Sequence, residues 1–183
     1  FLGRGSEDPR FTGFQSVQAA ANANWSLSGA WALGATQSIA ADVGATLTLS
    51  GQISGVGAMQ LTGMGTVVLS GTNTFGGGVT VQNGTTLRVN RAANLGSGAL
   101  TLQGGRLVAD AGFTLANRVD LVTQGIVNTN SFGLNLSGPV QQYGGAADLV
   151  KEGAGTLTLQ NGSNAYNFAI VNQGTLAVNG GVL

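Results

Sequence analysis

The chain has 183 residues, of which 8% are charged and 32 are glycine, and its formal net charge is zero. A neutral surface with so few charges lacks the electrostatic attraction on which nucleic-acid binding depends, and it is poorly suited to anionic membranes. The absence of cysteine excludes disulfides, thiolate metal sites and thiol catalysis. The hydrophobic content of 43% is high enough to predict a folded chain.

We expect residues 1–10, which are rich in Gly, Arg, Ser and Pro, to form a linker or an N-terminal extension. From residue 11 onward, a glycine followed by aliphatic residues at alternate positions recurs. Its copies begin at Gly44, Gly65, Gly84, Gly105, Gly125, Gly155 and Gly174. The spacing is close to constant, at about 20 residues, which is typical of a solenoid. Only the step from Gly125 to Gly155 is longer, and it predicts a loop of about ten extra residues within 129–148.

Each copy alternates apolar and polar residues over three to five positions, as in Leu47-Thr48-Leu49. This is the pattern of a short, half-buried strand, and no run is long enough to predict a helix. Because so short a strand cannot bury its apolar face alone, about 20 residues should form one rung that stacks on the next at about 4.8 Å. We therefore predict an all-β fold, a right-handed parallel β-helix (solenoid) of about 7–8 rungs over residues 11–183. Its first inward column should be Leu47, Val67, Leu87 and Leu107, and Ile126 is the aliphatic residue of the next copy.

Asparagines at the strand ends should cap the turns and bond to the rungs above and below. They are Asn73, Asn83, Asn94, Asn117, Asn128 and Asn172. A longer period is also present, because the motifs at 47–51 and 63–67 are echoed at 134–138 and 153–157. Both echoes are offset by about 90 residues, and duplication of a block of about four rungs explains them.

Residues 149–159 read Leu-Val-Lys-Glu-Gly-Ala-Gly-Thr-Leu-Thr-Leu, and Tyr166 and a Gly-Thr-Leu-Ala-Val segment at 174–178 follow. This pattern resembles the β-strand repeat of autotransporter (type V secretion) passenger domains. A second copy at 63–75 is similar, although Leu61 stands at the lysine position. The resemblance covers about residues 11–183. It implies a protein at the bacterial surface or outer membrane, or secreted, which reaches a membrane only through a C-terminal β-barrel outside this fragment.

The resemblance implies an architecture more than an activity, because passengers with different functions share this rod. Our leading hypothesis is an adhesion or self-association scaffold that contacts a host cell-surface receptor, a glycan or another copy of itself through its faces. A passive stalk that presents a toxin or protease domain elsewhere in the full-length chain is the alternative. A polysaccharide-cleaving β-helix is the third hypothesis.

We expect no catalytic, cofactor or metal site, and therefore no enzyme. The chain has no His and no Cys, so Ser-His-Asp and Cys-His arrangements cannot form within it. A Ser-Lys pair would need Lys151, which we interpret as structural or solvated, and we expect Glu152 to lie in a turn. The glycine turns lack the aspartates of calcium-binding solenoids, and the Gly-x-Gly pairs lack the third glycine and the helix of a nucleotide loop.

One cluster of charged residues about a rung apart is the candidate ligand patch. Its members are Arg88, Arg91, Arg106, Asp110, Arg118 and Asp120. We interpret the cluster as a surface ion-pair ladder, with a ligand patch as the alternative. Six aromatic residues could stack on sugar rings but more often cover the core in such folds. They are Trp25, Trp31, Phe75, Tyr143, Tyr166 and Phe168.

Overall fold

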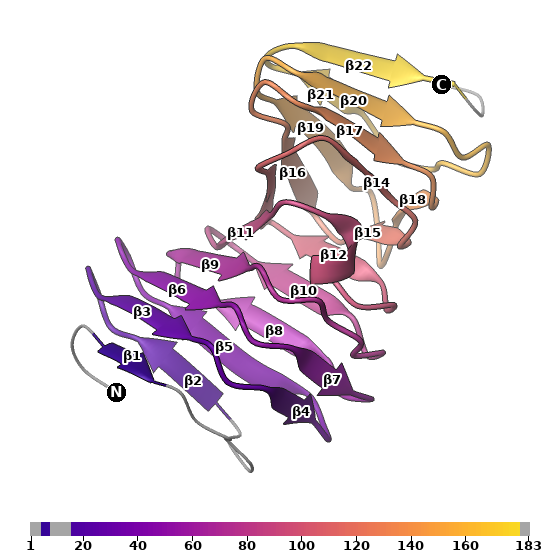
Figure 1. The fold of residues 1–183 in the computed structure, drawn as a ribbon. Coiled ribbons are helices and arrows are strands. Elements are labelled where there is room, and N and C mark those ends of the chain that lie inside the picture. The colour runs from indigo at the N-terminus through magenta and orange to yellow at the C-terminus, as the bar shows by residue number, and fades with distance from the viewer. Residues whose placement is uncertain (1–4, 8–15, 180–183) are drawn as a thin grey trace.

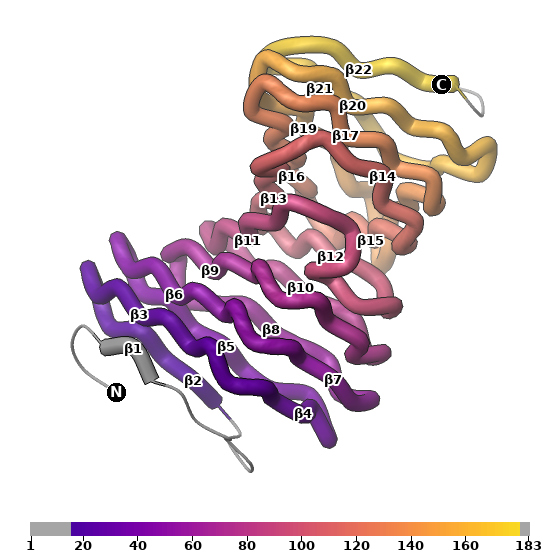
Figure 2. The backbone as a smooth tube through the Cα atoms, viewed as in Figure 1, coloured from indigo at the N-terminus to yellow at the C-terminus, as the bar shows by residue number. Residues whose placement is uncertain are grey.

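The computed structural model describes residues 5–7 and 16–179, which form a parallel β-solenoid of about eight coils. Figure 1 shows the strands stacked as successive coils from the N-terminal to the C-terminal end, and Figure 2 follows the backbone through them. All pairs of named strands are parallel, and the described residues contain no α-helix. No helix among them is long and apolar enough to cross a membrane. The predicted parallel β-helix is therefore confirmed.

The strands lie on three faces. Sheet A consists of β1 (Gly5–Glu7), β3 (Asn24–Leu27), β6 (Thr46–Leu49), β9 (Thr66–Leu69), β11 (Thr86–Val89), β13 (Arg106–Ala109), β16 (Gln124–Asn128), β19 (Asp148–Glu152) and β21 (Ala169–Val171). Sheet B consists of β2 (Ser16–Ala19), β5 (Gln37–Ala41), β8 (Met59–Thr62), β10 (Val79–Gln82), β12 (Leu100–Gln103), β15 (Val119–Leu121) and β18 (Val140–Gln142). The third face holds β4 (Trp31–Leu33) and β7 (Ile53–Gly55), and later β14 (Phe113–Leu115), β17 (Gly133–Leu136), β20 (Thr156–Leu159) and β22 (Thr175–Val178).

The predicted inward column is confirmed. Leu47 pairs with Val67, Val67 with Leu87, and Leu87 with Leu107, and all four side chains are buried. Alternation within each strand directs every second side chain into the core, so that aliphatic residues at matching positions stack along the rod. The burial of this column and its counterparts on the other faces holds successive coils together.

The predicted loop within 129–148 is wrong, because this segment contains β17 and β18. The inward column of sheet A continues from Leu107 to Val127 and then to Lys151, and only this last step is slightly longer than the usual one. The extra length lies in the connection 143–147 between β18 and β19. The Gly155 copy of the motif belongs to β20 on the third face, where Leu157 pairs with Leu134. A glycine followed by aliphatic residues at alternate positions fits any corner that leads into a strand, so this motif does not specify on which of the three faces the strand lies.

A related correction concerns β16, where the repeat predicts Ile126 as an inward residue. Ile126 pairs with Arg106 on the outer surface, and the buried residue is Val127. Side chains alternate between the two sides of a strand, and in β16 the inward positions are those of Gly125 and Val127. Ile126, which lies between them, therefore points outward.

Part of the N-terminal segment expected to be a linker belongs to the solenoid. Gly5–Glu7 forms β1 and pairs in parallel with Trp25–Leu27 of β3. The rest of residues 1–10 lies outside the described residues.

Between β7 and β14 the third face has no strand, and asparagines complete its hydrogen bonding. In the first of these two coils, Asn73 accepts a bond from the backbone N–H of Ile53 (2.8 Å) and donates to the carbonyl of Asn94 (2.6 Å). In the second, η1 (Ala92–Asn94), a single 3₁₀ turn, places Asn94 so that it donates to the carbonyl of Gly71 (2.9 Å). Both asparagines are buried. The expectation that amides bond across rungs is confirmed here, although their partners are backbone groups.

Lys151 occupies an inward position of sheet A between Val127 and Val171 and is fully buried. Its Nζ donates to the carbonyls of Glu152 (2.7 Å), Gly153 (2.7 Å) and Gln173 (3.1 Å). These bonds join the corner after β19 to the equivalent corner of the next coil. The interpretation of Lys151 as structural is thereby confirmed, and a solvated position is excluded.

The corner glycines predict a sharp steric limit. A Cβ on Gly71 would overlap the carbonyl oxygen of Gly51 in the coil beneath, whereas a Cβ on Gly34 would meet no atom within 4 Å. Gly71→Ala should therefore lower the free energy of unfolding by about 1–3 kcal/mol, because backbone atoms must move apart. Gly34→Ala is the matched control and should leave it nearly unchanged. Chemical denaturation followed by circular dichroism measures both, and equal stability of the two variants would contradict the close-packed corner.

Lys151 predicts a dependence of stability on pH. Desolvation by burial lowers the pKa of Lys151 below the ordinary lysine value of 10.5, and the charge of Glu152 opposes this shift in part. Between the lowered pKa and about 10.5, the unfolded chain binds more protons than the folded one, so stability rises with pH. Denaturation of the wild type and Lys151→Met at several pH values should show the wild type gaining stability relative to the variant across this window. A constant difference would contradict the prediction.

Candidate functional site

The outward face of sheet A changes its chemistry along the rod. Thr46, Thr66 and Thr86 pair in one outward column, and the next position in that column is Arg106. The neighbouring column contains Arg88, Val108 and Asn128, in register with one another on β11, β13 and β16. A plain threonine ladder thus gives way to a mixed surface of arginine, asparagine and aliphatic side chains.

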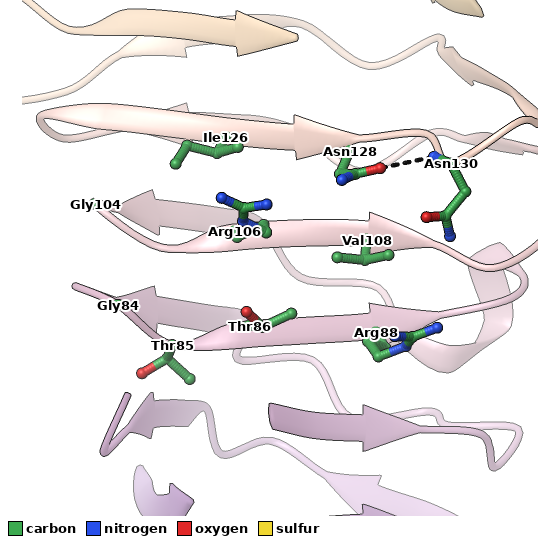
Figure 3. Close-up of a pocket in the computed structure, with 10 residues that line it drawn as sticks. All are labelled: Gly84, Thr85, Thr86, Arg88, Gly104, Arg106, Val108, Ile126, Asn128 and Asn130. Carbon is green, nitrogen blue, oxygen red and sulfur yellow. Dashed lines mark hydrogen bonds between the residues drawn. The ribbon is translucent and has the colours of Figure 1, made fainter. Parts of the chain in front are cut away.

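This mixed surface forms a groove of about 410 Å³ over β11, β13 and β16. Figure 3 shows its lining residues on three stacked strands and on the turns at their ends, with Val108 and Ile126 among the polar groups. Val108 is buried although it points outward, and Ile126 is half-buried. The groove therefore has an apolar floor with polar side chains around it, and its volume lies within the range of roughly 300–1,000 Å³ that small-molecule sites occupy.

Two ion pairs cross the coils at this groove, and their arginines, Arg88 and Arg106, are among its lining residues. Arg88 binds Asp110 of the next coil through two hydrogen bonds of 2.6 and 3.0 Å. Arg106 binds Glu152 at 2.6 and 3.4 Å, spanning the intervening coil. Both arginine side chains remain partly exposed, at 44% for Arg88 and 36% for Arg106, so they are accessible from solvent. Each positive charge has one carboxylate partner, so these four groups carry no net formal charge.

Asparagines form the far edge of the groove. Asn130 donates from Nδ2 to the carbonyl of Ala109 (3.0 Å) and to Asp110 (3.2 Å). Its backbone N–H donates to Oδ1 of Asn128 (2.7 Å), a bond drawn in Figure 3. Asn130 adopts a positive φ of 48°, which asparagine tolerates better than most residues. These bonds fix the orientation of the Asn128 amide and of the Asp110 carboxylate.

The structure divides the six predicted patch residues among three places. Arg88, Arg106 and Asp110 lie together at the groove. Arg91 lies at the corner before η1, where it donates to the carbonyl of Ser70 (2.9 Å). Arg118, which immediately precedes β15 of sheet B, forms an ion pair of 2.8 Å with the buried Asp120 of that strand. Arg88 and Asp110 form an ion pair between successive coils, as the predicted ladder requires, whereas Arg118 and Asp120 pair within one coil, and the six residues do not form one patch.

Sequence reasoning missed most of the groove and the partner of Arg106. The missed lining residues are Thr85, Thr86, Val108, Ile126, Asn128 and Asn130. Among these, the sequence suggests only a turn cap for Asn128 and a core place for Ile126. Glu152, expected in a turn, is an outward strand residue in register with Asn128. The signal that could have found Glu152 is strand alternation, because an inward Lys151 requires the next side chain to point outward.

The remaining acidic and aromatic residues give little support to a metal site or to a second binding site. Among the described residues, no three acidic groups gather in a way that could hold a metal ion. Asp42 accepts a bond from Gln18 and Asp148 from Asn167. Trp31 and Phe75 are buried, as expected for aromatics that cover the core, and Trp25 and Tyr166 pack against it. Tyr143 and Phe168 are exposed and remain open to contact.

Two segments of the chain match the family model of the passenger-associated-transport-repeat, at residues 60–89 and 149–183. In the first, Leu61 lies inward on sheet B, and in the second, Lys151 occupies the equivalent place in the motif but lies inward on sheet A. The two repeats are therefore rotated by one face relative to each other.

The chain is also similar to an adhesin autotransporter named BmaC of Brucella suis biovar 1 (strain 1330). The identity is 34% over 157 residues, which cover 78% of this chain and 4% of that protein. The chain thus spans a small fraction of the length of this relative. No solved structure matches the chain. The repeats, the solenoid and this relative together show that the chain belongs to the autotransporter passenger domains that carry the passenger-associated-transport repeat.

Proposed function

We propose that this segment is an adhesive scaffold: a rigid β-helix at the bacterial surface, or secreted, whose sheet A presents the groove to a partner. The passenger family supports the surface-exposed or secreted location, and the relative named an adhesin supports the adhesive role. The observation that carries the proposal is the groove itself, which is lined mainly by outward side chains of three stacked strands and by residues of the turns at their ends. Outward positions are not needed for the core, so they are available for contact with a partner.

A catalytic role has less support from the groove chemistry. Its two carboxylates, Asp110 and Glu152, each bind an arginine. Glycan cleavage needs one acidic group to donate a proton and a second to act as base or nucleophile, at a matched separation. Both carboxylates accept hydrogen bonds from guanidinium groups, so neither is left free to face the bond of a substrate. We therefore place the function of this segment in binding.

The adhesive role can be tested with beads coated with the purified chain, measured for binding to cultured host cells. Asn128→Lys places a long, charged side chain at the groove and should reduce cell binding by about tenfold, through steric and electrostatic exclusion of the partner. Asn135→Lys is the matched control, because Asn135 is an outward residue of β17 on the third face. This variant should bind cells as the wild type does.

The competing hypotheses give different results in the same assay. Wild-type beads that bind no cells and do not aggregate would indicate a passive stalk and contradict the adhesive role. Beads that aggregate with one another, equally in both variants, would indicate self-association through a face other than the groove.

A further inference from the structure

We propose that the groove on sheet A binds a neutral saccharide, with the apolar face of a sugar ring packed against Ile126 above the buried Val108 and its hydroxyl groups bound by the surrounding polar side chains. This inference rests on the proposed function, because it names the chemistry of the partner that the groove contacts. It is carried by the floor of the groove, by its free hydrogen-bonding groups and by its charge balance.

The floor suits the apolar face of a sugar ring. Val108 of β13 and Ile126 of β16 point outward from adjacent strands, each paired with a polar neighbour, Asn128 and Arg106 respectively. The two aliphatic side chains therefore lie diagonally next to each other on the sheet surface, between polar groups. A pyranose has a face of C–H groups and an edge of hydroxyls, and it can cover such a floor while keeping its hydroxyls at the rim.

The rim keeps hydrogen-bonding capacity for a ligand. Within the described part of the chain, the Nδ2 of Asn128 and the hydroxyl of Thr86 have no hydrogen-bond partner, while Oδ1 of Asn128 is held by Asn130. Arg88 uses Nε and one terminal nitrogen on Asp110, and its other terminal nitrogen remains available. Amide and guanidinium groups are planar donors that can bind two adjacent hydroxyls at once.

The charge balance favours a neutral sugar over an acidic one. Asp110 and Glu152 already compensate Arg88 and Arg106, with contacts of 2.6 Å in both pairs. An anionic sugar would have to compete with these carboxylates for the guanidinium groups and would be repelled by them. A neutral saccharide can bind the remaining donors without displacing either carboxylate.

A peptide partner is less suited to this surface. An extended peptide gains affinity by adding a strand to an exposed sheet edge. The strands under the groove, β11, β13 and β16, are each paired on both sides, so their backbone groups are already used. A peptide would have only side-chain contacts in this shallow, outward-facing groove.

The test is a titration of the isotope-labelled chain with neutral trisaccharides (maltotriose, cellotriose, mannotriose and triacetylchitotriose), followed by NMR. Trigalacturonate is the anionic comparison. At least one neutral sugar should shift the Asn128 side-chain amide signals and the backbone signals of Val108 and Ile126, and trigalacturonate should bind more weakly. Asn128→Ala should weaken the binding of that sugar about three- to tenfold, the loss of one hydrogen bond. Asn135→Ala on the third face should leave it unchanged.

A charge variant separates the neutral site from a simple basic patch. Glu152→Gln leaves Arg106 without its carboxylate, so the affinity for trigalacturonate should rise while neutral binding persists. The proposal is overturned if no neutral trisaccharide shifts the groove signals, or if the wild type prefers trigalacturonate. In that case, cell binding that is still reduced by Asn128→Lys would preserve the adhesive role. Saccharide binding by a chain that binds no cells would overturn only the adhesive role.

Discussion

Backbone hydrogen bonding between successive coils is the constraint on which the rest of the structure depends. The strands are three to five residues long, so none of them can satisfy its backbone groups or cover its apolar face without the coils above and below. Parallel pairing in a fixed register brings equivalent residues over one another, and inward positions must then be apolar in nearly every coil. At the corners the backbones approach so closely that a side chain on Gly71 would meet the Gly51 carbonyl. The abundance of glycine follows from this geometry.

The three faces make nearly the same demands on the sequence, which explains an otherwise confusing feature of the chain. A small residue at the corner, followed by inward aliphatics at alternate positions, fits any face. The motif that begins at Gly65 leads into sheet A, while its copy at Gly155 leads into the third face. Two copies of one repeat can therefore lie one face apart without loss of core packing, because the inward columns accept equivalent residues. Their outward residues, however, then appear on different sides of the rod.

The same reasoning decides which features could be predicted from the sequence. The inward column from Leu47 to Leu107 was predictable because its members recur at a nearly constant spacing and strand alternation fixes their direction. The pair of Arg88 and Asp110 was also within reach, because the two residues lie about one coil apart. The position of Gly155 was not predictable, because its motif does not name a face. If the Gly155 motif is assigned to the same face as the Gly44 motif, a loop is needed at the segment where the chain forms β17 and β18.

The groove could not be predicted for a more specific reason, which is that it depends on the direction of single side chains. Val127 occupies the core place that the repeat predicts for Ile126, and this shift by one position turns an expected core residue into the floor of a site. Arg106 and Glu152 are two coils apart, and one of those coils is longer than its neighbours, so regular spacing could not pair them.

Outward positions differ from inward ones in how much freedom they allow. The column of Thr46, Thr66 and Thr86 accepts Arg106 as its next member, with no change in the backbone pairing of the sheet. Because the fold is held by inward columns and corners, a few outward substitutions are enough to create a groove on a face that otherwise carries a column of threonines. Each arginine introduced there lies within two coils of a carboxylate, so the surface stays neutral. Selectivity in such a groove must come from the arrangement of donors, acceptors and apolar floor, since net charge contributes little.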